Sequence, residues 1–229
     1  HNFESIDKTK NSIIFIAGAG MDHRLVRAIK LTDAEYNKPL IIDLPGHGDS
    51  KGSSSNSIES YSQFLVNALK DYDLEDFSLC GHSMGGLVTL DIALKHGLAV
   101  KELILVNSIY PTRVADALLA KAQAGNGHAA DFIIKYGLHR RLLGLKNAFS
   151  DANDPVMLDD LEACNNYQLD LNNNLDEIIN LINNEEPDYI FNFAAQSMVA
   201  ESWKSPEQWF TTNAVSMTRL FNELKHCSF

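Results

Sequence analysis

A serine on a glycine-rich corner is the feature of this sequence that points most directly to chemistry. The string Gly81-His82-Ser83-Met84-Gly85 fits the pattern G-x-S-x-G, and it stands where the strand-like run 77–80 gives way to a helical pattern. A sharp turn of this kind lifts a serine hydroxyl above the edge of a sheet, and the flanking glycines avoid the clash that side chains would cause. The predicted chemistry is nucleophilic attack by Ser83.

A turn of small residues earlier in the chain predicts the second part of such a site. The string Ala17-Gly18-Ala19-Gly20 follows another strand-like run, so its backbone N–H groups are expected to face the same point as the N–H of Met84. Two such donors form an oxyanion hole, which stabilises the negative charge that develops on a carbonyl oxygen and contributes about 10²–10³ in rate per donor.

A tight loop, residues 43–50, follows the second strand-like run. Its sequence Asp43-Leu44-Pro45-Gly46-His47-Gly48-Asp49-Ser50 is rich in turn-forming residues. We interpret His47 and Asp49 as structural residues of this turn.

Short apolar runs alternate with helical patterns around these motifs. The strand-like runs are bounded by Gly, Pro, Asp or Asn and cover residues 13–17, 40–43, 77–81 and 103–107. Helical spacing follows at 58–69 and from 87 onward, and alanine- and leucine-rich helical segments replace the strands from about residue 111. We therefore expect an α/β fold with a mostly parallel sheet, helices on both faces and a helical cap insertion. The expected domains are a core over 1–110, a cap over 111–168 and a C-terminal helix–strand–helix segment over 169–229. In that segment the helices are expected at 175–182 and 206–224 and the strand at 189–193.

These motifs, in this order, resemble the α/β-hydrolase superfamily, in particular its small capped esterases and C–C-bond hydrolases. The resemblance covers about residues 11–169, including the run 103–108, and Ala17 replaces the histidine that usually precedes the glycine of the oxyanion loop. It implies that Ser83 is the nucleophile and that Ala19 and Met84 supply the oxyanion-hole N–H groups. The implied substrate is a small ester, thioester or related acyl compound.

A serine hydroxyl needs a histidine base that a carboxylate orients. The superfamily places an acid in a motif such as G-x-x-D and then a histidine in a G-H pair, and neither motif follows Ser83. His226 follows in the right order and is the candidate base, with Glu201 as the candidate acid. His96, His128 and His139 are expected to be solvated or packing residues.

The C-terminal segment resembles a different family. Residues 187–197, Pro-Asp-Tyr-Ile-Phe-Asn-Phe-Ala-Ala-Gln-Ser, are similar to part of an extended short-chain dehydrogenase/reductase of the nucleotide-sugar 4,6-dehydratase type. That family also requires a G-x-x-G-x-x-G turn and a Y-x-x-x-K pair, and this sequence has neither. No cofactor is therefore expected. The alternative functions are an NAD-binding dehydratase fragment and a non-catalytic ligand-binding protein built on the hydrolase fold.

The composition of the chain excludes some classes of binding partner. The 229 residues carry a net charge of −11, so nucleic acid and anionic membrane surfaces are not expected partners. Cys80, Cys164 and Cys227 lie far apart and suggest buried free thiols in a reducing compartment, so we expect a cytoplasmic protein with no metal site. The expected partner is the small acyl substrate, and the oligomeric state is left open.

Overall fold

A computed structural model describes most of the chain. The described residues are 6–7, 10–28, 36–70, 77–96, 98, 100–108, 113–136, 149, 154–167, 175–185 and 206–227. Within them, no helix is long and apolar enough to cross a lipid bilayer.

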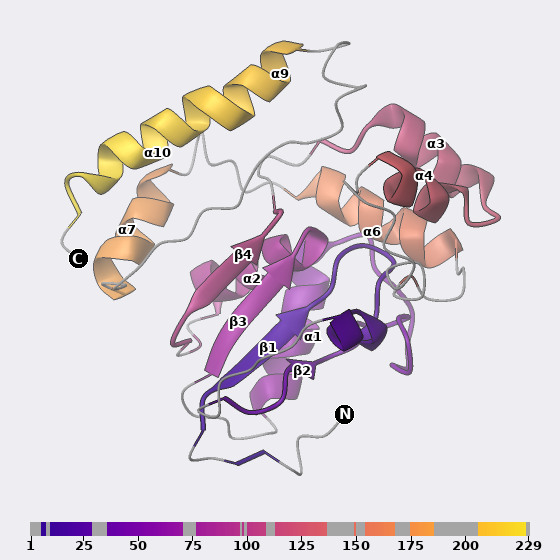
Figure 1. The fold of residues 1–229 in the computed structure, drawn as a ribbon, viewed down its shortest axis with the longest axis horizontal. Helices are drawn as coiled ribbons and strands as arrows, with labels where there is room; N and C mark the ends of the chain where they lie inside the picture. The colour runs from indigo at the N-terminus through magenta and orange to yellow at the C-terminus, as the bar shows by residue number, and fades with distance from the viewer. Residues whose placement is uncertain are drawn as a thin grey trace.

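A parallel sheet forms the centre of the described structure (Figure 1). Its strands are β1 (Ser12–Ile16), β2 (Leu40–Ile41), β3 (Phe77–His82) and β4 (Leu103–Val106), in the order β2-β1-β3-β4. Every strand pair in it is parallel. The four strands fall within one or two residues of the predicted runs, so the expected α/β class with a parallel sheet flanked by helices is confirmed.

Two helices cover the sheet and form the core with it. The helix α1 (Ile58–Lys70) is amphipathic and buries a stripe that includes Ile58, Tyr61 and Leu65. The helix α2 (Met84–Lys95) packs on β1, β3 and β4 and against α1, and its residues 84–92 are all buried. A helix enclosed in this way is apolar around most of its circumference, which is why the sequence there shows little polar periodicity.

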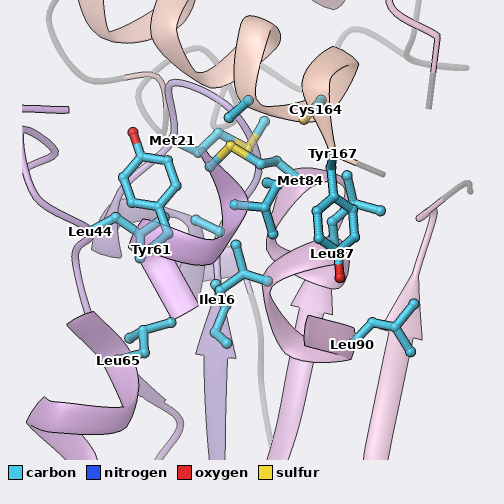
Figure 2. Close-up of a cluster of buried hydrophobic side chains, with 14 of the residues drawn as sticks. Ile16, Met21, Leu44, Tyr61, Leu65, Met84, Leu87, Leu90, Cys164 and Tyr167 are labelled. Atoms are coloured by element: carbon cyan, nitrogen blue, oxygen red, sulfur yellow. The ribbon is translucent and has the colours of Figure 1, made fainter. Parts of the chain in front are cut away.

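Most of the described residues in the predicted cap, 111–168, are helical, and Phe149 forms a β-bridge with Met21. Its helices are α3 (Asp116–Ala124), α4 (His128–Tyr136) and α6 (Asp154–Asn166). Gly125 and Gly127, both with positive φ, separate α3 from α4, and Figure 1 places the three helices above the carboxyl ends of the strands. Figure 2 shows Cys164 and Tyr167, at the end of α6, lying over Met84 and Leu87 of α2. Cap and sheet therefore share one hydrophobic core.

The remaining helices come before and after these elements. A 3-10 helix, η2 (His23–Ala28), follows β1, and the C-terminal segment contains α7 (Leu175–Glu185), α9 (Pro206–Phe210), the π-helix η3 (Thr211–Ser216) and α10 (Met217–Leu224). The two predicted helices of that segment are confirmed. The strand predicted at 189–193 lies outside the described residues, and the proposed domain boundaries stay predictions.

The three cysteines are free thiols. Cys80 and Cys164 are buried as expected, and burial raises the pKa of Cys80 to about 11. Cys227 differs from the expectation because it is only half-buried, near the end of the C-terminal helix.

Candidate active site

The corner between β3 and α2 holds Ser83 in a strained backbone conformation. Its φ of 54° and ψ of −119° lie outside the regions that residues with a side chain ordinarily adopt. Such a conformation costs on the order of 1–3 kcal/mol and persists only where the surrounding structure enforces it. The side chain of Ser83 is partly exposed rather than buried. Ser83 therefore lies at the surface of the site, at the corner that the G-x-S-x-G pattern predicts.

Hydrogen bonds and close backbone contacts enforce this conformation. The N–H of Ser83 donates to the carbonyl of Val106 at 3.0 Å, and the Ser108 hydroxyl donates to the Ser83 carbonyl at 3.0 Å. A Cβ atom on Gly85 would lie 2.1 Å from the carbonyl oxygen of Ile16. Only glycine allows the first turn of α2 to approach the end of β1 this closely.

The turn after β1, residues 17–20, lies directly beside Ser83, and we call it the oxyanion loop. A Cβ atom on Gly18 would lie 3.1 Å from the Cβ atom of Ser83, so these two residues are in contact. The N–H of Met21 donates to the carbonyl of Gly18 at 3.0 Å and closes the turn. No described residue accepts a hydrogen bond from the N–H of Ala19 or of Met84. Main-chain donors without a partner among the described residues, beside a partly exposed serine, can donate hydrogen bonds to an oxyanion that forms there.

A buried carboxylate in the cap joins three parts of the core. Asp160 of α6 is fully buried, and its Oδ2 atom accepts hydrogen bonds from the N–H of Gly20 and from Nε2 of His47, both at 2.7 Å. Its Oδ1 atom accepts a 2.6 Å hydrogen bond from the hydroxyl of Tyr61. The cap is thereby anchored on the oxyanion loop, on the 43–50 loop and on α1.

The surroundings of His47 favour its charged form. Its Nε2 atom faces the carboxylate of Asp160, and its Nδ1 atom lies 3.1 Å from the carbonyl oxygen of Pro45. Both neighbours are acceptors, so both ring nitrogens donate only in the imidazolium state. Burial by itself lowers the pKa of His47, but the hydrogen bond and charge of Asp160 outweigh it and raise the pKa above 6.5. Burial and the nearby charge of Asp160 also raise the pKa of Tyr61, which keeps its hydroxyl a donor.

A second histidine–carboxylate pair joins the start of η2 to the 43–50 loop. Nδ1 of His23 lies 2.8 Å from Oδ2 of the buried Asp43, whose Oδ1 atom accepts a 2.7 Å hydrogen bond from the N–H of His23. Asp43 also accepts a 3.1 Å hydrogen bond from the N–H of Asp49. The 43–50 loop thus has the structural role that we expected, and it adds the contact between His47 and Asp160.

The histidine just before Ser83 has a different environment. Burial lowers the pKa of His82, so this side chain is neutral near pH 7. Its Nδ1 atom is buried and has no hydrogen-bond partner among the described residues.

The predicted site residues fall into two groups. Ser83, Ala19 and Met84 come together at the carboxyl edge of the sheet, as expected from the motifs. His226 follows α10, its side chain is exposed, and none of its described hydrogen bonds reaches Ser83. Glu201 lies outside the described residues. The base and the acid stay predictions, and the described part of the chain contains no imidazole that is hydrogen-bonded to Ser83.

The chain is similar to known proteins over the region that holds these motifs. A model of the alpha/beta hydrolase family matches residues 13–215, which include the strained serine corner, the oxyanion loop and the cap. The chain belongs to the alpha/beta hydrolase family. This family assignment supports a hydrolytic enzyme, as the motifs predicted. It extends through most of the segment 169–229, whose resemblance to a dehydratase stays a prediction.

Individual relatives of this alpha/beta hydrolase match to different extents. The 2-succinyl-6-hydroxy-2,4-cyclohexadiene-1-carboxylate synthase of Escherichia coli O7:K1 is 33% identical over 87 residues, which are 38% of this chain and 34% of the relative. The chain thus matches about a third of the length of this curated relative.

Two solved structures share the fold. A lipase-esterase related protein from Clostridium acetobutylicum has a TM-score of 0.62 at 22% identity, covering 76% of this chain and 72% of that one. MenH from S. aureus also has a TM-score of 0.62, at 17% identity, covering 97% of this chain and 96% of that one.

Asp160 is the residue of this region that sequence reasoning missed. The buried face of α6 carries four apolar side chains: Val156, Met157, Leu161 and Cys164. Asp160 falls on that face, four residues after the first of them and four before the last. An acidic residue at an apolar position of an amphipathic helix is a signal for a buried partner. The sequence does not say which partner it meets.

Proposed function

We propose that this chain is a serine hydrolase in which Ser83 is the nucleophile and the N–H groups of Ala19 and Met84 form the oxyanion hole. The substrate is a small ester, thioester or related acyl compound. The observation that carries the proposal is the strained, partly exposed Ser83 in contact with the oxyanion loop. Strain that local hydrogen bonds and glycine contacts maintain around one hydroxyl is characteristic of a reactive position.

The chemistry follows from this arrangement. The Oγ atom of Ser83 attacks the acyl carbonyl carbon, its proton passes to a base, and the carbonyl oxygen becomes an oxyanion between the two N–H groups. The tetrahedral intermediate collapses to an acyl-serine, and the alcohol or thiol leaves with the proton from the base. Water then attacks the acyl-serine, releases the carboxylic acid and restores the Ser83 hydroxyl. His226 is the proposed base and Glu201 the proposed acid.

A fluorophosphonate probe tests the nucleophile directly. We expect covalent labelling of the wild-type chain, located at Ser83 by peptide mass spectrometry, and no labelling of the Ser83→Ala variant. Ser53→Ala is the matched control because Ser53 is exposed and lies in a loop. An unlabelled wild-type chain beside a labelled reference hydrolase refutes the proposal.

The base has a separate test, in which the turnover of substrate is measured. His226→Gln is expected to reduce steady-state hydrolysis of ester and thioester substrates by a factor of about 10² or more. The matched control is His128→Gln, since His128 is an exposed histidine of the cap. Equal turnover by the two variants excludes His226 as the base without affecting the assignment of Ser83.

A further inference from the structure

We propose that Asp160 is a positioning residue for the oxyanion hole: its carboxylate holds the Gly20 amide and thereby aims the N–H of Ala19 at the site of the developing oxyanion. This inference rests on the proposed role of Ser83. It gives the cap a part in the chemical step, in addition to any part in enclosing substrate.

The first observation is that α6 sits directly on the oxyanion loop. Asp160 accepts the Gly20 N–H at 2.7 Å, and it is fully buried, so water does not compete for that hydrogen bond. The same helix contacts Gly20 through Met157, whose Cε atom would lie 2.4 Å from a Cβ atom built on Gly20. The φ of +65° at Gly20 also requires glycine. Two neighbouring side chains of the cap thus define the position of one loop residue.

The second observation is that the Ala19 peptide is held from both sides. On one side, Gly18 touches Ser83 and accepts a hydrogen bond from Met21. On the other side, the hydrogen bond to Asp160 fixes the plane of the peptide that joins Ala19 to Gly20. The Gly18 carbonyl and the Ala19 N–H belong to one peptide group, so the Met21 hydrogen bond fixes the plane of that N–H, and the Asp160 hydrogen bond fixes the peptide that follows it. Donors oriented before the reaction stabilise an oxyanion without a reorganisation cost.

The third observation concerns charge. A bare carboxylate close to an oxyanion hole would oppose the negative charge that forms there. The imidazolium of His47, 2.7 Å from Asp160, neutralises that charge, and Tyr61 supplies a further hydrogen bond. Asp160 therefore accepts the Gly20 N–H strongly while the pair that it forms with His47 carries no net charge. The network thereby gives a charged residue at this buried position a full set of hydrogen-bond partners.

The test compares labelling of Ser83 by a fluorophosphonate in three variants, with the inactivation rate constant and the probe affinity measured separately. Asp160→Leu removes the acceptor, and we expect the rate constant to fall by about tenfold or more with the probe affinity unchanged. Asp160→Asn keeps an oxygen that accepts from Gly20 and is expected to restore most of the rate. Tyr61→Phe removes another hydrogen bond of the network but leaves the Gly20 bond, so it is expected to lower thermal stability without slowing labelling.

The outcomes separate this inference from the function on which it rests. The proposed role of Asp160 is overturned if the wild-type chain is labelled and a folded Asp160→Leu variant reacts at the same rate. Ser83 then remains the nucleophile. A Tyr61→Phe variant slowed as much as Asp160→Leu also overturns the role of Asp160, because the network would then act only through stability. An unlabelled wild-type chain removes both proposals.

A second variant covers the case in which Asp160→Leu does not fold. Replacing the three side chains together, by His47→Leu, Tyr61→Phe and Asp160→Leu, leaves no unpaired polar side chain of the network in the core, and such apolar replacements of buried ion pairs are often tolerated. The Asp160 acceptor of the Gly20 N–H is still removed in this variant. A rate constant reduced by about tenfold in the folded triple variant supports the inference, and the wild-type rate overturns it.

Discussion

The hydroxyl of Tyr167 donates a 2.9 Å hydrogen bond to Oδ1 of Asp91. Both side chains are buried, and the bond connects the end of the cap helix α6 to the middle of α2. Lys95 lies 2.5 Å from the same carboxylate oxygen and 5.2 Å from the centre of the Tyr167 ring. The cap is therefore attached to α2 here, in addition to its attachment at Asp160.

Removing this hydroxyl tests the second attachment. Tyr167→Phe keeps the ring beneath Lys95 but removes the donor to Asp91, so the free energy of unfolding is expected to fall by about 1–3 kcal/mol. Denaturant unfolding measures the loss. Tyr36→Phe is the control, because no described residue is hydrogen-bonded to the Tyr36 hydroxyl. Equal stabilities of the two variants would show that the Asp91 bond adds nothing.

The raised pKa of His47 predicts a pH dependence of stability. A histidine whose pKa is higher in the folded state contributes stability that is complete below its ordinary pKa of 6.5 and is lost as the pH rises through the folded-state pKa. The stability difference between wild type and His47→Gln should therefore narrow as the pH rises above 6.5 and through the raised folded-state pKa. The charged and titratable groups that act on His47 are Asp160, Asp43 and Tyr61.

The measurement is denaturant unfolding at a series of pH values. His128→Gln is the matched control, since His128 is exposed, and its stability should follow wild type across the range. A difference that stays constant with pH would mean that folding leaves the pKa of His47 unchanged, and one that widens with pH would mean that burial keeps His47 neutral in the folded state.

The strained backbone at Ser83 predicts an unusual stabilising substitution. Glycine adopts a positive φ without the steric cost that a Cβ atom brings, so Ser83→Gly should be more stable than Ser83→Ala by about 1 kcal/mol or more. Both variants lose the hydroxyl, and neither should react with a fluorophosphonate. At Ser53, whose φ is not positive, the glycine variant should be no more stable than the alanine variant. The same order at both positions would contradict strain at Ser83.

The contact between Gly85 and Ile16 predicts a strong steric effect. A Cβ atom on Gly85 would overlap the Ile16 carbonyl, so Gly85→Ala should cost about 3 kcal/mol or more and reduce labelling of Ser83. Gly127→Ala is the comparison, because a Cβ atom there meets nothing within 4 Å and the cost comes from its φ of +72° alone, about 1–2 kcal/mol. Thermal and denaturant unfolding of the two variants give the comparison. A Gly85→Ala variant as stable as Gly127→Ala would argue against close packing of α2 on β1.

Some features of this protein followed from local sequence alone. Alternation of short apolar runs with helical spacing located β1, β3 and α1 closely, because the strand and helix periods leave different patterns over a few residues. The glycines around Ser83 likewise indicated the sharp corner, because only glycine fits where backbones approach so closely. The α/β class and the nucleophile candidate were therefore readable from the chain itself.

Contacts between distant residues were decided only by the tertiary structure. Asp160 meets His47 across 113 residues and Gly20 across 140, and no local pattern specifies such a pairing. Periodicity shows that position 160 of α6 faces inward, but what it faces depends on how the cap packs over the sheet. The protonated state of His47 depends on the same packing, because burial and the Asp160 charge act on it only once the two are brought together.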